Sequence, residues 1–115
     1  MMISLLRIKP VPEKRDDVLD ILRSVQELIA GLPGCGGCAC YEEHDRERTV
    51  LYVERWESKE DMQRHIRSDL YNRVISAMEF AREAPEIRFY EVSHRMGMEL
   101  IEALRSAGDA REAVV

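Results

Sequence analysis

Residues 49–56 read Thr-Val-Leu-Tyr-Val-Glu-Arg-Trp, a run of β-branched and aromatic residues that is typical of a β-strand. Successive side chains of a strand point to opposite faces of its sheet. One face therefore receives Val50, Tyr52, Glu54 and Trp56, and the opposite face receives Leu51, Val53 and Arg55. Because both sets contain large apolar side chains, the stretch predicts a strand that is covered on both faces.

Three further strands are predicted around this one. They cover residues 2–9, about 38–43 and 86–93, and residues 44–48 form a polar hairpin connection. The strands at 2–9 and 86–93 also present apolar side chains on both faces: Ile3 and Leu5 oppose Leu6 and Ile8, and Ile87 and Phe89 oppose Tyr90 and Val92. The whole sheet is therefore expected to have two apolar faces.

Two helical segments separate the strands. An amphipathic helix within residues 12–32 is predicted from apolar residues spaced three and four apart, namely Val18, Ile21, Leu22, Val25, Leu28, Ile29 and Leu32. A second helix is expected to begin at Ser58, to break at Ser68-Asp69, where a new N-cap forms, and to continue to Met78. The order β-α-β-β-α-β predicts one α+β domain with a four-stranded antiparallel sheet.

Right-handed connections place both helical segments on the same face of the sheet, so the other apolar face has no cover. Exposed apolar surface costs roughly 25 cal/mol per Å², and we therefore predict a homodimer formed through the sheet face. In the alternative, a short C-terminal helix from Gly97 through Leu104 covers this face within one chain. Residues 1–95 form the expected domain, residues 96–115 form a helical extension and tail, and residues 107–115 are expected to fray.

Composition narrows the class of protein. The 115 residues are 45% hydrophobic and 34% charged, which suits one globular core. The net charge of −5, with both signs mixed along the chain, opposes a nucleic-acid partner. No apolar run is long enough to span a membrane and the N-terminus does not resemble a signal peptide, so we expect no membrane association and a cytoplasmic location.

The three cysteines lie within six residues, at Cys35, Cys38 and Cys40. They are too close together to join distant parts of a fold, so structural disulfides are not expected. With His44 they are compatible with a soft metal or a reversible Cys35–Cys38 disulfide. In the other interpretation Cys38 and Cys40 share one strand face as small buried hydrophobes, and no metal is bound.

The segment Tyr52-Val53-Glu54-Arg55-Trp56-Glu57-Ser58-Lys59-Glu60, followed by His65 and Ser68-Asp69, resembles the antibiotic biosynthesis monooxygenase (ABM) domain family. Pro12, Arg15 and Val18 at the start of the first helix, and Pro33-Gly34-Cys35 after it, extend the resemblance over residues 2–93. The resemblance implies a dimeric ferredoxin-like α/β barrel, in agreement with the two apolar faces. It specifies the fold and leaves the reaction open.

The resemblance also implies a candidate activity, cofactor-free monooxygenation of a phenolic or quinol-type metabolite. In such a reaction a base deprotonates the small aromatic substrate, whose anion then gives an electron to dioxygen. His65 is the candidate base because imidazole changes charge near neutral pH. The other candidate catalytic residues are Trp56 and Tyr52, and the candidate substrate-binding residues are Arg7, Tyr71 and Glu54.

These residues also have purely structural interpretations. Trp56 suits a core anchor, and His65 lies on the same half-buried side of its helix as Met62 and Ile66. Glu54 is expected in a buried pair with an arginine, Arg55, Arg7 or Arg88. Two other functions remain open: a non-catalytic small-molecule-binding or stress-response dimer, and a thiol redox or metal sensor.

The haem-degrading branch of the family does not fit this chain. That branch needs an axial histidine in the second helical stretch and an asparagine in the first strand. The corresponding positions hold Ile75 and Leu6.

Overall fold

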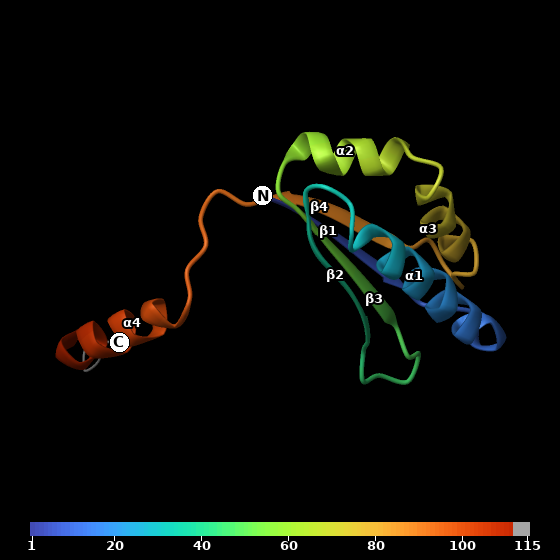
Figure 1. Cartoon of the computed structure of the whole chain (residues 1–115). Coiled ribbons are helices and arrows are strands. Elements are labelled where there is room, and N and C mark those ends of the chain that lie inside the picture. The colour runs from blue at the N-terminus through green and yellow to red at the C-terminus, as the bar shows by residue number, and fades with distance from the viewer. Residues whose placement is uncertain (112–115) are drawn as a thin grey trace.

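The computed structural model describes residues 1–111 of the chain. Its elements follow in the predicted order β-α-β-β-α-β, with a further helix at the C-terminus (Figure 1). They are β1 (Met2–Ile8), the 3₁₀ helix η1 (Pro12–Lys14), α1 (Arg15–Ile29), β2 (Cys35–Glu42), β3 (Val50–Trp56), α2 (Lys59–Arg67), α3 (Tyr71–Met78), β4 (Glu86–Glu91) and α4 (Met98–Arg111).

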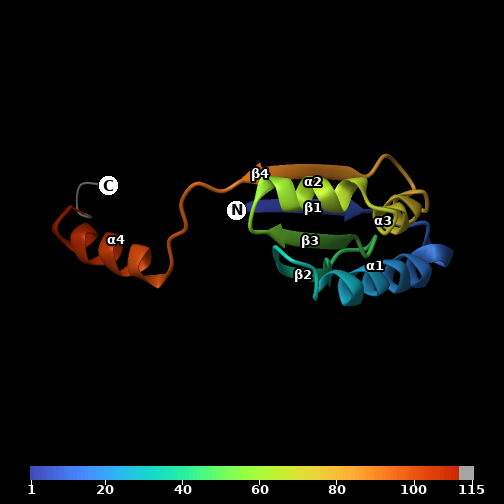
Figure 2. The same ribbon diagram turned by 45° about the horizontal axis from the view of Figure 1, so that its top comes forward.

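The four strands form one antiparallel sheet in the order β2-β3-β1-β4. The helices α1, α2 and α3 all lie on one side of it, here called the helix face (Figure 2). The opposite side, the open face, carries no helix. The strand registers give it Ile3, Leu5, Arg7, Ala39, Tyr41, Leu51, Val53, Arg55, Arg88 and Tyr90.

The core lies between the helix face and the helices. Leu6, Tyr52 and Trp56 of the sheet are buried there against Leu22 and Val25 of α1. The predicted alternation of β1 and β3 is confirmed, since every second residue of each strand is buried. Two members of the predicted helical stripe are not core residues, because Leu28 is 52% exposed and Leu32, beyond the end of α1, is 41% exposed.

Two element boundaries differ from the sequence prediction. The strand β2 begins at Cys35, three residues early, because Gly36 forms a bulge and Cys35 and Gly37 on either side of it pair with β3. The predicted helix break at Ser68-Asp69 is confirmed, but Ser68 does not cap α3; its hydroxyl donates to the His65 carbonyl at 2.6 Å. Ser58 does cap α2, because its Oγ accepts from the Asp61 amide at 3.1 Å.

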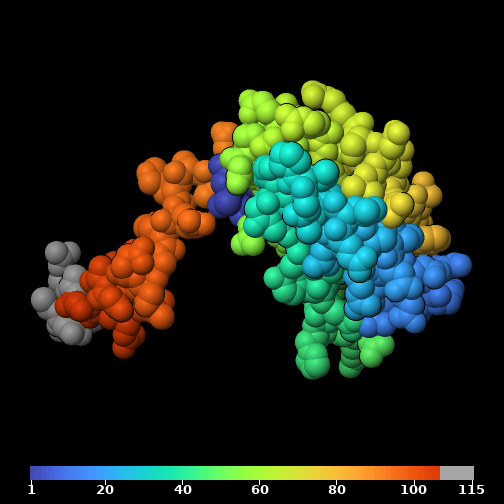
Figure 3. Space-filling view, in the orientation of Figure 1, coloured from blue at the N-terminus to red at the C-terminus, as the bar shows by residue number. Residues whose placement is uncertain are grey.

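The helix α4 does not cover the open face. It projects away from the sheet and its helices (Figures 1 and 3), and Met98, Ile101 and Leu104 are more than half exposed. The within-chain alternative is therefore wrong. The helix extends beyond the predicted Leu104 to Arg111, while the fraying expected from residue 107 stays a prediction and residues 112–115 lie outside the described residues. Among residues 1–111, no helix is long and apolar enough to cross a bilayer.

Candidate functional site

The strand β3 supplies three side chains to the candidate site. Tyr52, Glu54 and Trp56 alternate along it and share one face, as predicted; this face lies toward the helices, and each residue is 1% exposed. The strand is flanked by β2 and β1, so its backbone is fixed on both sides. A carboxylate in such a position is costly to bury unless its oxygen atoms accept hydrogen bonds.

The helix α2 places His65 over these residues. The Ser58 cap fixes the first turn of α2, and His65 follows almost two turns later on the same face as Met62. Both side chains are buried, and His65 is only 3% exposed. The imidazole lies 4.9 Å from the Trp56 ring, centroid to centroid, and 5.3 Å from the Tyr71 ring, which meets it edge-on.

Glu54 is the centre of a buried hydrogen-bond cluster. Tyr52 donates to its Oε2 at 2.7 Å, Trp56 donates to its Oε1 at 3.1 Å, and His65 Nε2 lies 3.1 Å from Oε2. Burial alone would raise the pKa of Glu54. The hydrogen bond and electrostatic effect of His65, with the bonds from Tyr52 and Trp56, nevertheless hold that pKa below its ordinary value of 4.5. Glu54 is therefore an ionised acceptor, and the predicted pair with an arginine is wrong.

The two nitrogen atoms of His65 have different surroundings. An ionised Glu54 accepts only, so Nε2 carries the hydrogen that it donates to Glu54. In the neutral ring Nδ1 is then unprotonated and has a free lone pair. Nδ1 is buried, and no group within the described residues hydrogen-bonds to it. Within the described residues, this nitrogen therefore has a lone pair that no hydrogen bond uses.

The neighbouring tyrosines stay protonated at neutral pH. Burial, followed by the negative charge of Glu54, raises the pKa of Tyr71 to about 12. The same two causes raise the pKa of Tyr52 above its ordinary range, and its contact with Cys38 adds to the effect. Both phenols are therefore hydrogen-bond donors rather than bases, and His65 is the group in the cluster suited to accept a proton.

A cleft of about 180 Å³ lies beside His65 and Trp56. It is formed where the turn after α1 meets α2, and its lining is more apolar than polar. A backbone hydrogen bond joins this turn to the connection between β3 and α2: the Glu57 amide donates to the Gly34 carbonyl at 2.8 Å. The residues that line the cleft are Leu32, Pro33, Trp56, Asp61, Arg64, His65 and Ser68.

Sequence reasoning did not assign the wall of this cleft. The helical periodicity predicts Leu32 as a core residue, and no pattern assigns a role at the cleft to Pro33 or Asp61. The available signal was the family resemblance, which already included Pro33-Gly34 and Ser68 without giving them a function. Only the fold shows that these segments, 28 residues apart between Pro33 and Asp61, form two sides of one space.

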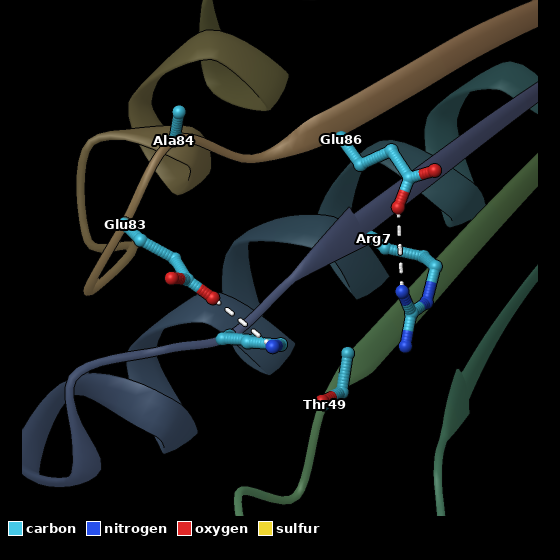
Figure 4. A pocket seen from close by; sticks show the side chains of 6 residues that line it. Arg7, Thr49, Glu83, Ala84 and Glu86 are labelled. Atoms are coloured by element: carbon cyan, nitrogen blue, oxygen red, sulfur yellow. Dashed lines mark hydrogen bonds and ion pairs between the residues drawn. The ribbon is translucent and has the colours of Figure 1, made fainter.

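Arg7 is not part of this cluster. It lies on the open face, on the other side of the sheet from Glu54, and pairs with Glu43 at 2.7 Å and with Glu86 at 3.3 Å. Figure 4 shows it beside Glu86 in a separate small pocket of about 110 Å³. The bonds and charges of these two carboxylates raise its pKa further above its ordinary value. Arg7 therefore lies apart from Tyr71, and the binding of a ligand oxygen by these two residues stays a prediction.

The three cysteines are free. Cys38 and Cys40 lie on the same face of β2, as predicted, and pair in register with Glu54 and Tyr52. Burial raises the pKa of Cys38 to about 12 and also raises that of Cys40, so both remain neutral thiols. Among the described residues, no three His, Cys, Asp or Glu side chains are placed to bind one metal ion together.

The geometry agrees with comparisons to known proteins. The family model for antibiotic biosynthesis monooxygenase matches residues 1–77, which include β3, His65 and both walls of the cleft. The chain belongs to the antibiotic biosynthesis monooxygenase family. Within this ABM chain, the hydrogen-bond cluster and the cleft lie entirely inside the matched segment, whereas β4 and α4 lie beyond it.

Solved structures support the fold of this ABM protein. Rv0793 from Mycobacterium tuberculosis superposes with a TM-score of 0.75 and 18% identity, over 84% of this chain and 98% of that one. A conserved protein from Methanosarcina mazei superposes with a TM-score of 0.71 and 22% identity, over 79% of this chain and 92% of the other. At these identities the similarity shows the fold alone. No curated protein matches the sequence.

Proposed function

We propose that this ABM protein is a cofactor-independent monooxygenase that acts on a phenolic or quinol-type metabolite, with His65 as the base. One observation carries the proposal: Glu54 occupies Nε2 of His65, while the buried Nδ1 has no partner among the described residues and the residue lines a cleft. A histidine held in this way by a carboxylate is oriented as a general base, and the carboxylate stabilises the imidazolium that forms.

The proposed reaction needs no redox group from the protein. His65 takes the phenol proton, and the phenolate gives one electron to dioxygen. The resulting radicals join at a ring carbon ortho or para to the oxygen that carries hydrogen. The imidazolium of His65 returns its proton to the peroxide, which loses water, with that ring hydrogen, to leave a quinone. In sum, one phenol and one dioxygen give one quinone and one water. The substrate loses four electrons, and dioxygen accepts all four.

The other cluster residues support this chemistry by position. Trp56 contributes apolar surface to the wall of the cleft next to His65, where it can contact an aromatic substrate. Tyr71, protonated at neutral pH, is proposed to donate to the substrate oxygen, and Tyr52 holds Glu54 in place. Sequestering the phenolate from water in this site favours electron transfer to dioxygen over reprotonation.

A purely binding role finds less support. That role would be favoured if aliphatic side chains enclosed His65. Its neighbours are instead the carboxylate of Glu54 and the rings of Trp56 and Tyr71. The site is therefore equipped for proton transfer and not only for packing.

We also propose that the protein acts as a homodimer joined through the open face. Ile3, Leu5, Leu51 and Val53 form an apolar centre on this face, and Tyr41 and Tyr90 are about half exposed beside it. Charged pairs around Arg7 and Lys9 form a polar margin at one end. An apolar centre with a polar rim is typical of a protein interface. The free thiols support a cytoplasmic location, where thiols stay reduced.

Oxygen uptake tests the proposed activity. We expect the wild type to consume oxygen with at least one phenol or quinol from a panel, and His65→Gln to lower that rate by about 100-fold or more. Glutamine retains a donor for Glu54, and unfolding curves should confirm that the variant folds. His94→Gln, a change at an exposed histidine, is the matched control and should leave the rate unchanged.

Two outcomes would count against this assignment. Equal rates for the wild type and His65→Gln would remove His65 as the base. The absence of uptake by the wild type with every phenol in the panel would favour the binding role.

A further inference from the structure

We infer that the cleft admits substrates with a single aromatic ring and that Leu32 sets this limit. The inference rests on the proposed function, because it concerns the ligand of the same site. Its first support is size. A cavity of about 150 Å³ holds one benzene molecule. The cleft of about 180 Å³ opens to solvent, and the volume within its walls is close to that of one substituted ring and smaller than three fused rings require.

The second support is that the walls of the cleft are fixed. On one side, Leu32 and Cys35 close a turn, since the Cys35 amide donates to the Leu32 carbonyl at 3.2 Å, and Glu57 donates to Gly34 at 2.8 Å. On the other side, Asp61 accepts from Ser58 at 2.8 Å and from Arg64 at 3.0 Å. Widening the cleft would require breaking several of these bonds together.

The third support is the position of Leu32 itself. Helical periodicity predicts a core residue there, yet Leu32 is 41% exposed and lines the cleft opposite Arg64 and Ser68. An exposed leucine on a turn that is otherwise held by backbone bonds gains little from the core. At the cleft it offers an apolar contact for one aromatic ring and a steric barrier to a second.

The fourth support is the neutral rim. Arg64 is paired with Asp61, so the cationic and anionic groups at the cleft cancel each other. The rim therefore offers no unpaired charge to a carboxylate or phosphate on the ligand. The chemistry that fits is an uncharged phenol or quinol of one ring, with its hydroxyl directed to His65.

Anaerobic binding measurements test the inference without any turnover. Trp56 is the only tryptophan of the chain and lines the cleft, so its fluorescence reports occupancy. The probes are benzene-1,4-diol and anthracene-9,10-diol, which share the two hydroxyl groups and differ in ring number. For the wild type we expect the one-ring diol to bind at least tenfold tighter. This order is diagnostic because a larger apolar area alone would favour the three-ring diol.

Leu32→Ala should remove the discrimination by tightening the binding of the three-ring diol at least tenfold. Leu28→Ala is the matched control, because Leu28 is also an exposed leucine of this region and does not line the cleft. It should leave both affinities unchanged.

The outcomes separate the two proposals. Equal or tighter binding of the three-ring diol to the wild type, or no change in Leu32→Ala, would overturn the size limit and leave the proposed function standing. Failure of both diols to bind the wild type would overturn the proposed function with it.

Discussion

At the scale of single residues, the feature that needs explanation is a glutamate buried in the middle of a β-strand. Glu54 is tolerated there because Tyr52, Trp56 and His65 all direct hydrogen-bonding groups to its two oxygen atoms. The same bonds fix the orientation of the imidazole. Stability and the proposed proton transfer therefore depend on the same carboxylate.

Glu54→Gln should lower the free energy of unfolding at pH 7 by about 1–3 kcal/mol, because an amide leaves at least one buried donor without an acceptor. The pKa of Glu54 is lowered in the folded state, so its stabilisation is complete above its ordinary value of 4.5 and is lost as the pH falls below that value. The difference between wild type and variant should therefore shrink on acidification. Urea unfolding between pH 3 and pH 7 measures it.

The exposed Glu57 provides the control for this experiment. Glu57→Gln should change the unfolding free energy by less than about 0.5 kcal/mol over the same pH range. A difference between Glu54→Gln and wild type that stays constant down to pH 3 would show that Glu54 is not ionised in the fold.

The sequence predicted which residues share a strand face with Glu54 but not its hydrogen-bond partner His65. Strand alternation is local, so it correctly places Tyr52, Glu54 and Trp56 together. Which arginines share that face depends on the register between strands, and the pairing of Arg7 with Leu51 puts Arg7 on the other side. The pair with His65 depends on how α2 packs over β3, which no local pattern contains.

At the scale of elements, the turn between α1 and β2 positions one wall of the cleft. Gly34 has a φ of 83°, in the region that favours glycine, and it lies directly against the Asp61 carboxylate. A residue with a side chain would be strained in this backbone conformation, and its Cβ atom would clash with Asp61. Hydrogen bonds with Ser58 and Arg64 hold Asp61 in place. The turn and the first part of α2 therefore fit together only with glycine at this position.

Gly34→Ala should lower the free energy of unfolding by about 1–3 kcal/mol, the usual cost of a left-handed conformation for a residue other than glycine. It should also weaken binding of the one-ring diol, because Asp61 must move. Gly31→Ala, three residues earlier, has open space around the new methyl group and serves as control. Thermal unfolding of both variants measures the two losses of stability. A larger loss for Gly31→Ala than for Gly34→Ala would contradict this role of Gly34.

The element boundaries that sequence reasoning missed have a common cause. The glycines of β2 are typical of a loop, yet Gly36 forms a bulge and Gly37 pairs with Arg55 of β3, and that pairing depends on the neighbouring strand. The wall residues Leu32 and Pro33 were likewise assigned by local pattern alone. Interactions between distant segments decide both, so the sequence predicts the elements well and their junctions less well.

At the scale of the whole molecule, the sheet has the two apolar faces that strand alternation predicts, and only one of them is covered by helices. The helices cover one face, and α4 leaves the other open (Figure 1). Local patterns were enough to predict the two apolar faces, because the side chains of every strand alternate between them in the same way. The position of α4 could not be predicted, since a short amphipathic helix does not specify the surface on which it packs.

Val53→Glu should dissociate the proposed dimer without unfolding the domain. Val53 lies on the open face between Leu5 and Ala39. In a symmetric interface each protomer would then bury one unpaired carboxylate, which is costly. Sedimentation at micromolar concentration should show a dimer for the wild type and a monomer for Val53→Glu, with unchanged circular dichroism. Leu28→Glu, on an exposed helix position, should remain dimeric. A monomeric wild type would contradict the proposal.

The most direct test of the central claim is the tautomer of His65, because the proposed chemistry depends on which nitrogen is free. In ¹⁵N NMR spectra of the neutral imidazole, the account predicts a protonated Nε2, hydrogen-bonded to Glu54, and an unprotonated Nδ1 whose shift changes when the one-ring diol binds. A protonated Nδ1, or an Nδ1 signal that does not respond to the bound diol, would contradict it.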